Sequence, residues 1–267
     1  MRQVLLLAVS LLVLLATPGW ARSGETAVRY VDCVNGDDGS DGLSWMTAVG
    51  SVEAAFGSLP GCAWNPEELP CIAGFEVNVA SGVCEMPQWI DMPTTGGVVR
   101  GMGRDLTRLT SSWNYPSEFR IRVQELSPLR RYSFESMSTY RVSLDASGGV
   151  ITIADMDLQG VIVTRGDLRV QNSTLWSVFL QQGESIDISD SIVGAGVGVL
   201  HAFSVGEGTT RRMVIVRLDR NVLMAGTGTA VNLLAFTDAR ITAILHDNVV
   251  MGPVNTYGNV TIAGDQR

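Results

Sequence analysis

The fold is decided by three stretches of sequence, Ile151–Leu158 (ITIADMDL), Leu168–Leu175 (LRVQNSTL) and Ile186–Val193 (IDISDSIV). Two later stretches, Val216–Leu223 (VRLDRNVL) and Ala243–Val250 (AILHDNVV), carry the same pattern. All five align without gaps on one shared position, which is occupied by Met156, Ser173, Ser191, Asn221 and Asn248 at steps of 17, 18, 30 and 27 residues. Recurrence of this kind is typical of a protein built from stacked repeats.

The columns of this alignment are chemically uniform. Three positions before the shared position, the residue is always aliphatic: Ile153, Val170, Ile188, Leu218 and Leu245. When coils stack at the inter-strand spacing of about 4.8 Å, such columns become a continuous core, and polar columns lie in the turns. The pattern predicts an all-β fold, a single-stranded right-handed parallel β-helix. An antiparallel β-sandwich is the alternative, but it would not keep one column apolar at a fixed offset.

Two further features describe the rest of each coil. Val161 and Val163 match Val178 and Leu180 in the next repeat, which predicts a second, weaker set of strands. The two longer steps are expected to hold loop insertions, around residues 194–212 and 227–240. The coil length therefore varies, while the apolar columns stay constant.

Before the repeats, the sequence predicts a strand over Val28–Val34, a polar loop over Asn35–Ser44 and a short helix. The helix begins near Ser51, a good N-cap residue, and Glu53 lies in its first turn, where the helix dipole favours a negative charge. Its apolar face is predicted to pack on the core and consists of Val52, Ala55, Phe56 and Leu59. Pro60 and Gly61 are predicted to end it.

The first residues have the pattern of a secretory leader. Arg2 precedes an apolar run over Val4–Leu15, and small residues at Gly19 and Ala21 fit cleavage after Ala21. The run is too short to span a bilayer of about 30 Å as a helix, and no later segment is suited to do so. We expect a protein without a membrane span that is secreted, extracellular or periplasmic. The predicted organisation is a leader over 1–21, a strand, loop and capping helix over 22–72, and coils over 73–267.

The charge balance excludes several functions. The net charge is −8, and all 19 basic residues are arginine. An acidic chain is a poor partner for nucleic acid or an anionic membrane. The lack of lysine excludes a P-loop lysine, a Schiff-base lysine and a lysine general base.

The four cysteines, Cys33, Cys62, Cys71 and Cys84, all lie in the first third of the chain. Export places them in an oxidising compartment, so disulfides are expected. Three pairings are open. In the favoured one, Cys62 pairs with Cys71 across a short loop, and Cys33 with Cys84 ties the first strand to the first coil. No close cysteine pair suggests zinc.

Several short runs resemble a known family: Tyr30–Asp32, Asn35–Asp38, Asp41–Ser44, Thr47–Ala48, Val77–Gly82, Gly97–Gly101 and Asp105–Leu109. They look like the opening of secreted proteins of the pectin-lyase-like β-helix superfamily. In that superfamily a strand, a Gly/Asp loop and a short amphipathic helix cap the first coil. The resemblance implies a fold but no single function, because members include polysaccharide lyases, glycoside hydrolases and adhesins.

The outward columns of the later repeats suggest one candidate catalytic cluster. In register, Asp187, Arg217, Asp219 and His246 would lie on adjacent coils of one face. Such a group could perform general acid/base chemistry, since imidazole titrates near neutral pH. The alternative is a ladder of alternating charges that relieves repulsion between stacked coils.

The acidic loop near the N-terminus is a candidate metal site. Asp37, Asp38 and Asp41 could supply the oxygen ligands that calcium prefers. The alternative is a series of turns in which Asp side chains bond the backbone. No other cofactor is expected.

The tryptophans are candidates for stacking on sugar rings. Trp45, Trp64 and Trp89 are predicted to pack at the N-terminal cap, and Trp176 is predicted to be exposed.

Two functions follow from these observations. The first is a non-catalytic, secreted β-helix at the cell surface or outside the cell, with a binding or structural role and a polysaccharide or surface protein as partner. The alternative is a polysaccharide lyase or glycoside hydrolase acting on an extracellular polysaccharide. The final coil, with its polar tail Gly264–Arg267, is expected to self-associate or be covered by a partner, since open strand edges pair readily.

Overall fold

The computed structural model describes residues 25–60, 73–93, 95–111, 118–123, 131–180, 185–194, 200–205, 213–225, 230–236 and 239–266. The predicted leader, Trp64, Trp113 and the Cys62–Cys71 pair lie outside these residues. In the described ranges, no helix is long and apolar enough to cross a membrane.

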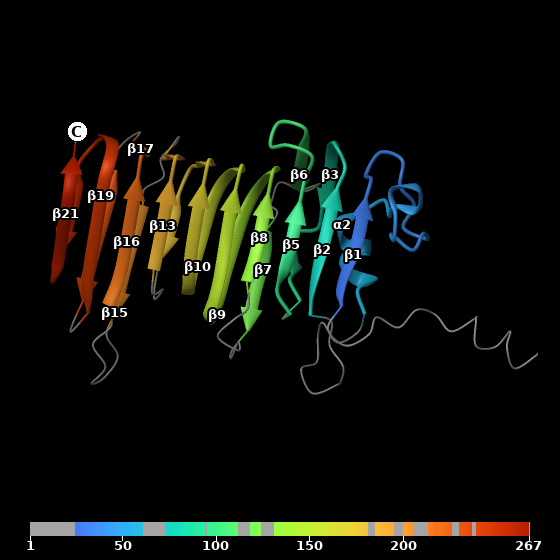
Figure 1. Ribbon diagram of the computed structural model, residues 1–267, viewed down its shortest axis with the longest axis horizontal. Coiled ribbons are helices and arrows are strands. Elements are labelled where there is room, and N and C mark those ends of the chain that lie inside the picture. The colour runs from blue at the N-terminus through green and yellow to red at the C-terminus, as the bar shows by residue number, and fades with distance from the viewer. Residues whose placement is uncertain are drawn as a thin grey trace, which may run out of the picture.

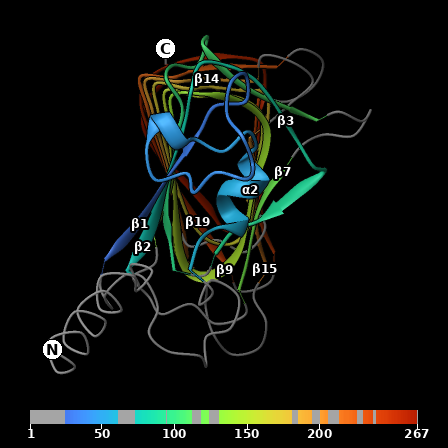
Figure 2. The same ribbon diagram turned by 90° about the vertical axis from the view of Figure 1, so that its right-hand side faces the viewer.

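The strands stack in parallel along one axis and form a β-helix with three faces (Figure 1, Figure 2). The long face is made of β1 (Thr26–Val31), β2 (Gly74–Val79), β5 (Gly97–Arg100), β8 (Arg131–Glu135), the ends of β9 (Ser138–Ala154) and β10 (Asp157–Gln171), β13 (Ser185–Ser189), β16 (Met213–Asp219), the start of β19 (Arg240–Met251) and β21 (Val260–Gln266).

The short face follows each strand of the long face across a tight corner. It contains β3 (Gly82–Met86), β6 (Thr107–Ser111), the starts of β9 and β10, β11 (Thr174–Leu175), β14 (Ile192–Val193), β17 (Val222–Met224) and the end of β19. The third face closes the coil. It contains β4 (Trp89–Asp91), β7 (Glu118–Val123), the middles of β9 and β10, β12 (Val178–Leu180), β15 (Leu200–Val205), β18 (Val231–Phe236) and β20 (Val254–Tyr257).

The strand register confirms the predicted aliphatic column. Ile153 pairs with Val170, Val170 with Ile188, Ile188 with Leu218, and Leu218 with Leu245. All five side chains are buried in one hydrophobic core. Every pairing among the described strands of these coils is parallel, which rules out the antiparallel sandwich.

Four of the predicted segments are two strands joined by a corner, and the fifth lies within β19, which bends at the same position. The corner residues all adopt positive φ near 50°: Ser136, Asp155, Asn172, Asp190, Arg220 and Asp247. Asp and Asn tolerate this left-handed conformation because their short polar side chains bond locally, and arginine does so rarely. The polar column of the alignment therefore marks the turn between the long and short faces.

The residues after four of these corners form a buried polar ladder: Ser173, Ser191, Asn221 and Asn248. Ser191 N donates to Asn221 Oδ1 over 2.9 Å, and Asn221 N donates to Asn248 Oδ1 over 2.9 Å. Ser173 N donates to Ser191 Oγ over 3.1 Å, and Met156 N to Ser173 Oγ over 3.1 Å. Side chains thus satisfy backbone N–H groups that the corner removes from the strand ladder.

The predicted second set of strands is confirmed, because Val161 pairs with Val178 and Val163 with Leu180. The segments expected to be loop insertions contain strands. Residues 200–205 form β15, and residues 231–236 form β18, and the two strands pair in register. In these longer coils the strand of the third face is therefore longer than β12 of the preceding coil. It lies inside the segment expected to be a loop.

The N-terminal elements follow the predicted order but differ at their ends. β1 begins at Thr26 rather than Val28, and helix α2 (Val52–Gly57) ends with Ser58 as its C-cap, before the predicted end at Pro60 and Gly61. The helix is capped at its start by Ser51, whose Oγ accepts from Ala54 N over 3.1 Å, and its apolar residues are buried. β1 ends at Val31, not Val34, because Asp32 Oδ1 accepts from the backbone N–H groups of Val34 and Asn35, which starts a turn. A short 3-10 helix, η1 (Trp45–Thr47), lies between β1 and α2.

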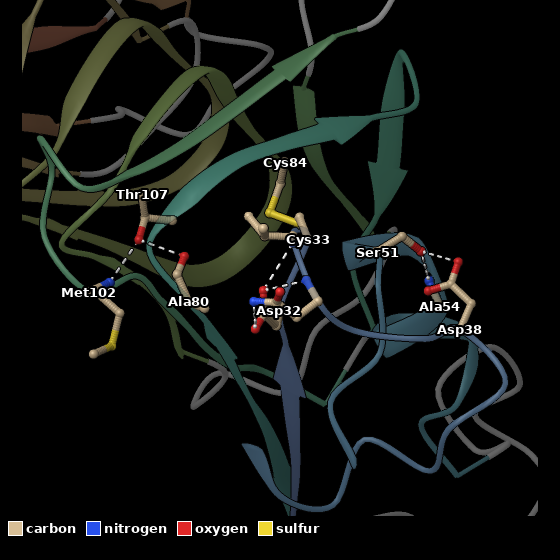
Figure 3. The surroundings of a disulfide bond; sticks show 11 residues. Asp32, Cys33, Asp38, Ser51, Ala54, Ala80, Cys84, Met102 and Thr107 are labelled. Atoms are coloured by element: carbon tan, nitrogen blue, oxygen red, sulfur yellow. Dashed lines mark hydrogen bonds between the residues drawn. A yellow bond between two sulfur atoms is a disulfide. The ribbon is translucent and has the colours of Figure 1, made fainter. Parts of the chain in front are cut away.

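The Cys33–Cys84 disulfide is confirmed and joins the turn after β1 to β3 (Figure 3). Cys84 is buried in the core, and Cys33 packs partly against it. At the other end of the stack, β20 and β21 leave Tyr257 and Ile262 exposed. Self-association through this coil stays a prediction.

Candidate functional site on the outer side of the long face

The four residues of the predicted cluster lie on three adjacent strands of the long face. Asp187 of β13 pairs in register with Arg217 of β16, and Asp219 of β16 pairs with His246 of β19. Ile188, Leu218 and Leu245 alternate with them and are buried. Because successive residues of a strand point to opposite faces, the four side chains point outward together.

One direct contact joins two members of the cluster. The Nδ1 atom of His246 lies 2.9 Å from Asp219 Oδ1, a hydrogen bond in which the imidazole donates when it is protonated. The same nitrogen lies 3.6 Å from Asp247 Oδ2. Within the described residues, no hydrogen bond or ion pair links Asp187 or Arg217 to this pair.

Asp219 is bound from a second side by Arg220, the corner residue. Arg220 Nη1 donates to Asp219 Oδ2, while its Nε and Nη2 donate to the two oxygens of Asp190 over 2.7 and 2.8 Å. The paired, parallel bonds to Asp190 are the strongest geometry available to a guanidinium and carboxylate. Arg220 thus joins two coils of the stack.

The electrostatics of this network favour the charged forms. The hydrogen bond to Asp219, helped by the charge of Asp247, raises the pKa of His246 above its ordinary value. The hydrogen bonds from Arg220 lower the pKa of Asp190. The His246 side chain is 65% exposed, so solvent screens these interactions.

A second group on the same face is organised in the same way. Arg100 Nη1 lies 3.0 Å from Glu76 Oε1, and Arg100 Nε lies 2.8 Å from Glu135 Oε2. The three residues belong to β5, β2 and β8, which are neighbours in the stack. Alternating charge across neighbouring coils is therefore a general property of this face, as the ladder interpretation predicts.

Sequence reasoning missed the corner residues of the network. Asp190, Arg220 and Asp247 belong to a polar column of the alignment, and the sequence does not assign them to the candidate cluster. The signal was present, because all three immediately precede the shared position of the repeat. What the sequence does not reveal is that a left-handed arginine places its guanidinium between two carboxylates.

The acidic loop consists of turns in which each carboxylate has its own backbone or hydroxyl partner. Asp37 Oδ1 accepts from Gly39 N over 2.9 Å, and Asp41 Oδ1 accepts from Leu43 N over 3.0 Å. Asp38 Oδ2 accepts from Ser51 Oγ over 3.0 Å, which joins the loop to the helix cap. Among the described residues, no group of three or more His, Cys, Asp or Glu side chains is placed to hold a metal ion. The calcium site stays a prediction.

The tryptophans differ from the prediction in part. Trp176 is exposed, as predicted, but Trp45 and Trp89 are exposed as well instead of being packed in the cap. The ring of Trp45 meets Tyr30 edge to face at 4.8 Å, and Trp89 lies against Arg120. Trp89 occupies an outward position of β4, where alternation directs side chains away from the core, and Trp45 lies in η1, which has no buried residue.

These features define the class of protein: an all-β solenoid of parallel coils, with a disulfide-linked N-terminal cap and an outer face of alternating charge. Comparison with family models, curated proteins and solved structures finds no match to this chain.

Proposed function

We propose that this protein is a secreted β-helix with a binding role outside the cell or at its surface, and that its ligand is an extracellular polysaccharide. The observation that carries the proposal is the state of the charged cluster. Asp219, the best placed carboxylate for acid/base chemistry, is shared between Arg220 and His246. A general base must be free to reach a substrate proton, and this carboxylate is engaged in stabilising the stack.

The disulfide supports the extracellular part of the proposal. Disulfides persist in oxidising compartments and are rare in the cytosol. A bridge with a buried Cys84 between the cap and the first coil suits a protein that must stay folded outside the cell, where chaperones do not assist it. The resemblance to the pectin-lyase-like superfamily adds polysaccharide as the ligand class.

The alternative function is a polysaccharide lyase or glycoside hydrolase, favoured by one observation. Asp187, Arg217, Asp219 and His246 do lie on neighbouring strands of a single outward face. Both an acid and a base could be drawn from such a set if substrate binding released Asp219 from Arg220.

The two functions are separated by incubating the purified chain with a panel of acidic and neutral polysaccharides. We expect retention on at least one polysaccharide, with neither ultraviolet-absorbing unsaturated products nor new reducing ends. Either product would favour the enzyme, provided that the Asp219→Asn variant abolishes it and Gln171→Ala, an exposed change on the same face, does not. No retention on any polysaccharide would contradict the proposed ligand class.

A further inference from the structure

The outer side of the third face carries a compact polar group near the N-terminal end of the stack. Trp89 and Asp91 lie on β4, and Glu118 and Arg120 lie on β7. The strands pair so that Trp89 is opposite Glu118 and Asp91 is opposite Arg120. The intervening residue of each strand is buried in the core, so these four side chains share the outward side.

The indole of Trp89 is held in place by an ion pair with little exposure to solvent. The guanidinium carbon of Arg120 lies 4.4 Å from the ring centroid, and Arg120 Nε lies 2.9 Å from Glu118 Oε2. The Arg120 and Glu118 side chains are only 19% and 13% exposed, whereas Trp89 is 44% exposed. A ligand that contacts the ring would meet a side chain that is already ordered, which reduces the entropy lost on binding.

Asp91 has an unusual environment in this group. Its Oδ1 atom is inaccessible to solvent and has no hydrogen-bond partner. Arg120 stands directly across from it on the neighbouring strand but bonds Glu118 instead. A buried acceptor without a partner is costly, so each one in a folded protein calls for an explanation. One explanation is that Asp91 Oδ1 gains a hydrogen-bond donor when a ligand binds.

We infer that Trp89 is a stacking platform for an uncharged pyranose ring of a glycan, flanked by the polar groups of Glu118 and Arg120. Asp91 is a positioning residue: once a ligand occupies the exposed part of the ring, an Nη group of Arg120 donates to its unpaired oxygen while Arg120 Nε keeps its bond to Glu118. This inference rests on the proposed glycan ligand and names the surface that would bind it.

The charges of the group select the kind of sugar. Two carboxylates, Asp91 and Glu118, lie beside Arg120, and Arg141 of β9 lies opposite Glu118, so the charges within the group balance. A uronate would find no uncompensated cation here and would be repelled by the net charge of −8 that the chain carries. An uncharged ring carries no such penalty, and its apolar face can stack on the indole.

The other exposed tryptophans lack these surroundings. Trp176 has the same exposure as Trp89, but the outward side chains near it on the next coil of the short face include the apolar Ile192. The ring of Trp45 is engaged edge to face with Tyr30. Only Trp89, among the described tryptophans, is bordered by a carboxylate and a guanidinium.

The test is calorimetric titration of the wild-type chain with three hexasaccharides: cellohexaose and hexa-N-acetylchitohexaose, which are uncharged, and hexagalacturonate, which is acidic. We expect an uncharged hexamer to bind and the acidic one to bind more weakly. Trp89→Ala should weaken binding about tenfold or more, whereas the matched control Trp176→Ala should leave it unchanged. Asp91→Asn should weaken binding while the melting temperature stays equal or rises.

Each result has a defined meaning. If Trp89→Ala binds as the wild type does, or if hexagalacturonate binds more tightly than the uncharged hexamers, the inference about Trp89 is overturned. The proposal that the protein binds a glycan would still stand. A lower melting temperature of Asp91→Asn with normal binding makes Asp91 a structural residue and removes its positioning role. A wild-type chain that is retained on none of the polysaccharides and binds none of the hexamers overturns the proposed glycan ligand itself.

Discussion

At the scale of single residues, Thr139 shows how an exception in a core column affects stability. It pairs in register with Leu158, at a position that is leucine or valine in the following coils. Its side chain is buried, and its hydroxyl has no hydrogen-bond partner. An unpaired buried hydroxyl opposes folding, because unfolding returns it to water.

Replacing this hydroxyl by a methyl group should therefore stabilise the protein. We expect Thr139→Val to raise the free energy of unfolding by about 1 kcal/mol, measured by urea denaturation. Thr107→Val is the matched control, because Thr107 is equally buried but accepts from Met102 N and donates to Ala80 O (Figure 3). That variant should lose stability. A Thr139→Val protein that is less stable than the wild type would contradict the explanation.

The second residue-scale prediction concerns His246. Its pKa is raised first by the hydrogen bond to Asp219 and then by the charge of Asp247. Protonation is thus favoured in the folded state, so the resulting stability is complete below the ordinary pKa of about 6.5 and is lost as the pH rises through the raised value. Asp219→Asn should bring the pKa of His246 back toward its ordinary value, as followed by NMR titration of the imidazole. An unchanged pKa in that variant would show that Asp219 does not set it.

At the scale of elements, the polar ladder is the feature that fixes the corner between the long and short faces. Asn221 Nδ2 donates to Ile188 O over 2.7 Å, and Asn221 Oδ1 accepts from Ser191 N. Asn221→Ala would leave both backbone groups buried without partners. We expect a loss of about 3 kcal/mol in the free energy of unfolding.

Serine provides the matched comparison for this element. Ser173 and Ser191 fill the same position in earlier coils and accept the same kind of backbone bond. Asn221→Ser should therefore keep part of the stability that Asn221→Ala loses, and Gln171→Ala, on the outer face, should be close to neutral. Equal losses in the serine and alanine variants would show that the ladder bond is not the stabilising contact.

The sequence predicts the elements well where the ladder and core columns repeat, and poorly elsewhere. From Ile151 to Val250 the alignment yields the observed register, because stacking places equal positions above each other. The coils of β2 and β5 show no such repeat in the sequence, because Val79 and Gly101 occupy the position that Ser136 and the later corner residues fill. For the candidate site, the register predicts that Asp219 and His246 are neighbours. The contacts of Arg220 could not be predicted, because they depend on a left-handed backbone conformation that arginine rarely adopts.

At the scale of the whole molecule, the disulfide connects the N-terminal cap to the first full coil. The bridge spans 51 residues between Cys33 and Cys84. Closing a loop of that length in the unfolded chain is expected to contribute up to about 4 kcal/mol, less any strain. The Cys33→Ala/Cys84→Ala double variant should lose stability of that order in thermal or urea unfolding.

The double variant is preferable to a reducing agent, because it removes only this bridge and leaves Cys62 and Cys71 unchanged. In the variant, the cap should separate from β3 before the later coils unfold, since repeats are stabilised mainly by their immediate neighbours. Hydrogen exchange that accelerates in β1 and α2 but not in β16 would support this order. Uniform acceleration along the whole chain would indicate instead that the bridge stabilises all coils together.

The unequal coil lengths have a practical meaning for protein engineering. Steps of 17, 18, 30 and 27 residues all return the chain to the same corner with the same inward side chain. The coils that contain β15 and β18 therefore hold the additional residues without shifting the register of the layers above and below. This solenoid could carry foreign peptides in those coils as a display scaffold.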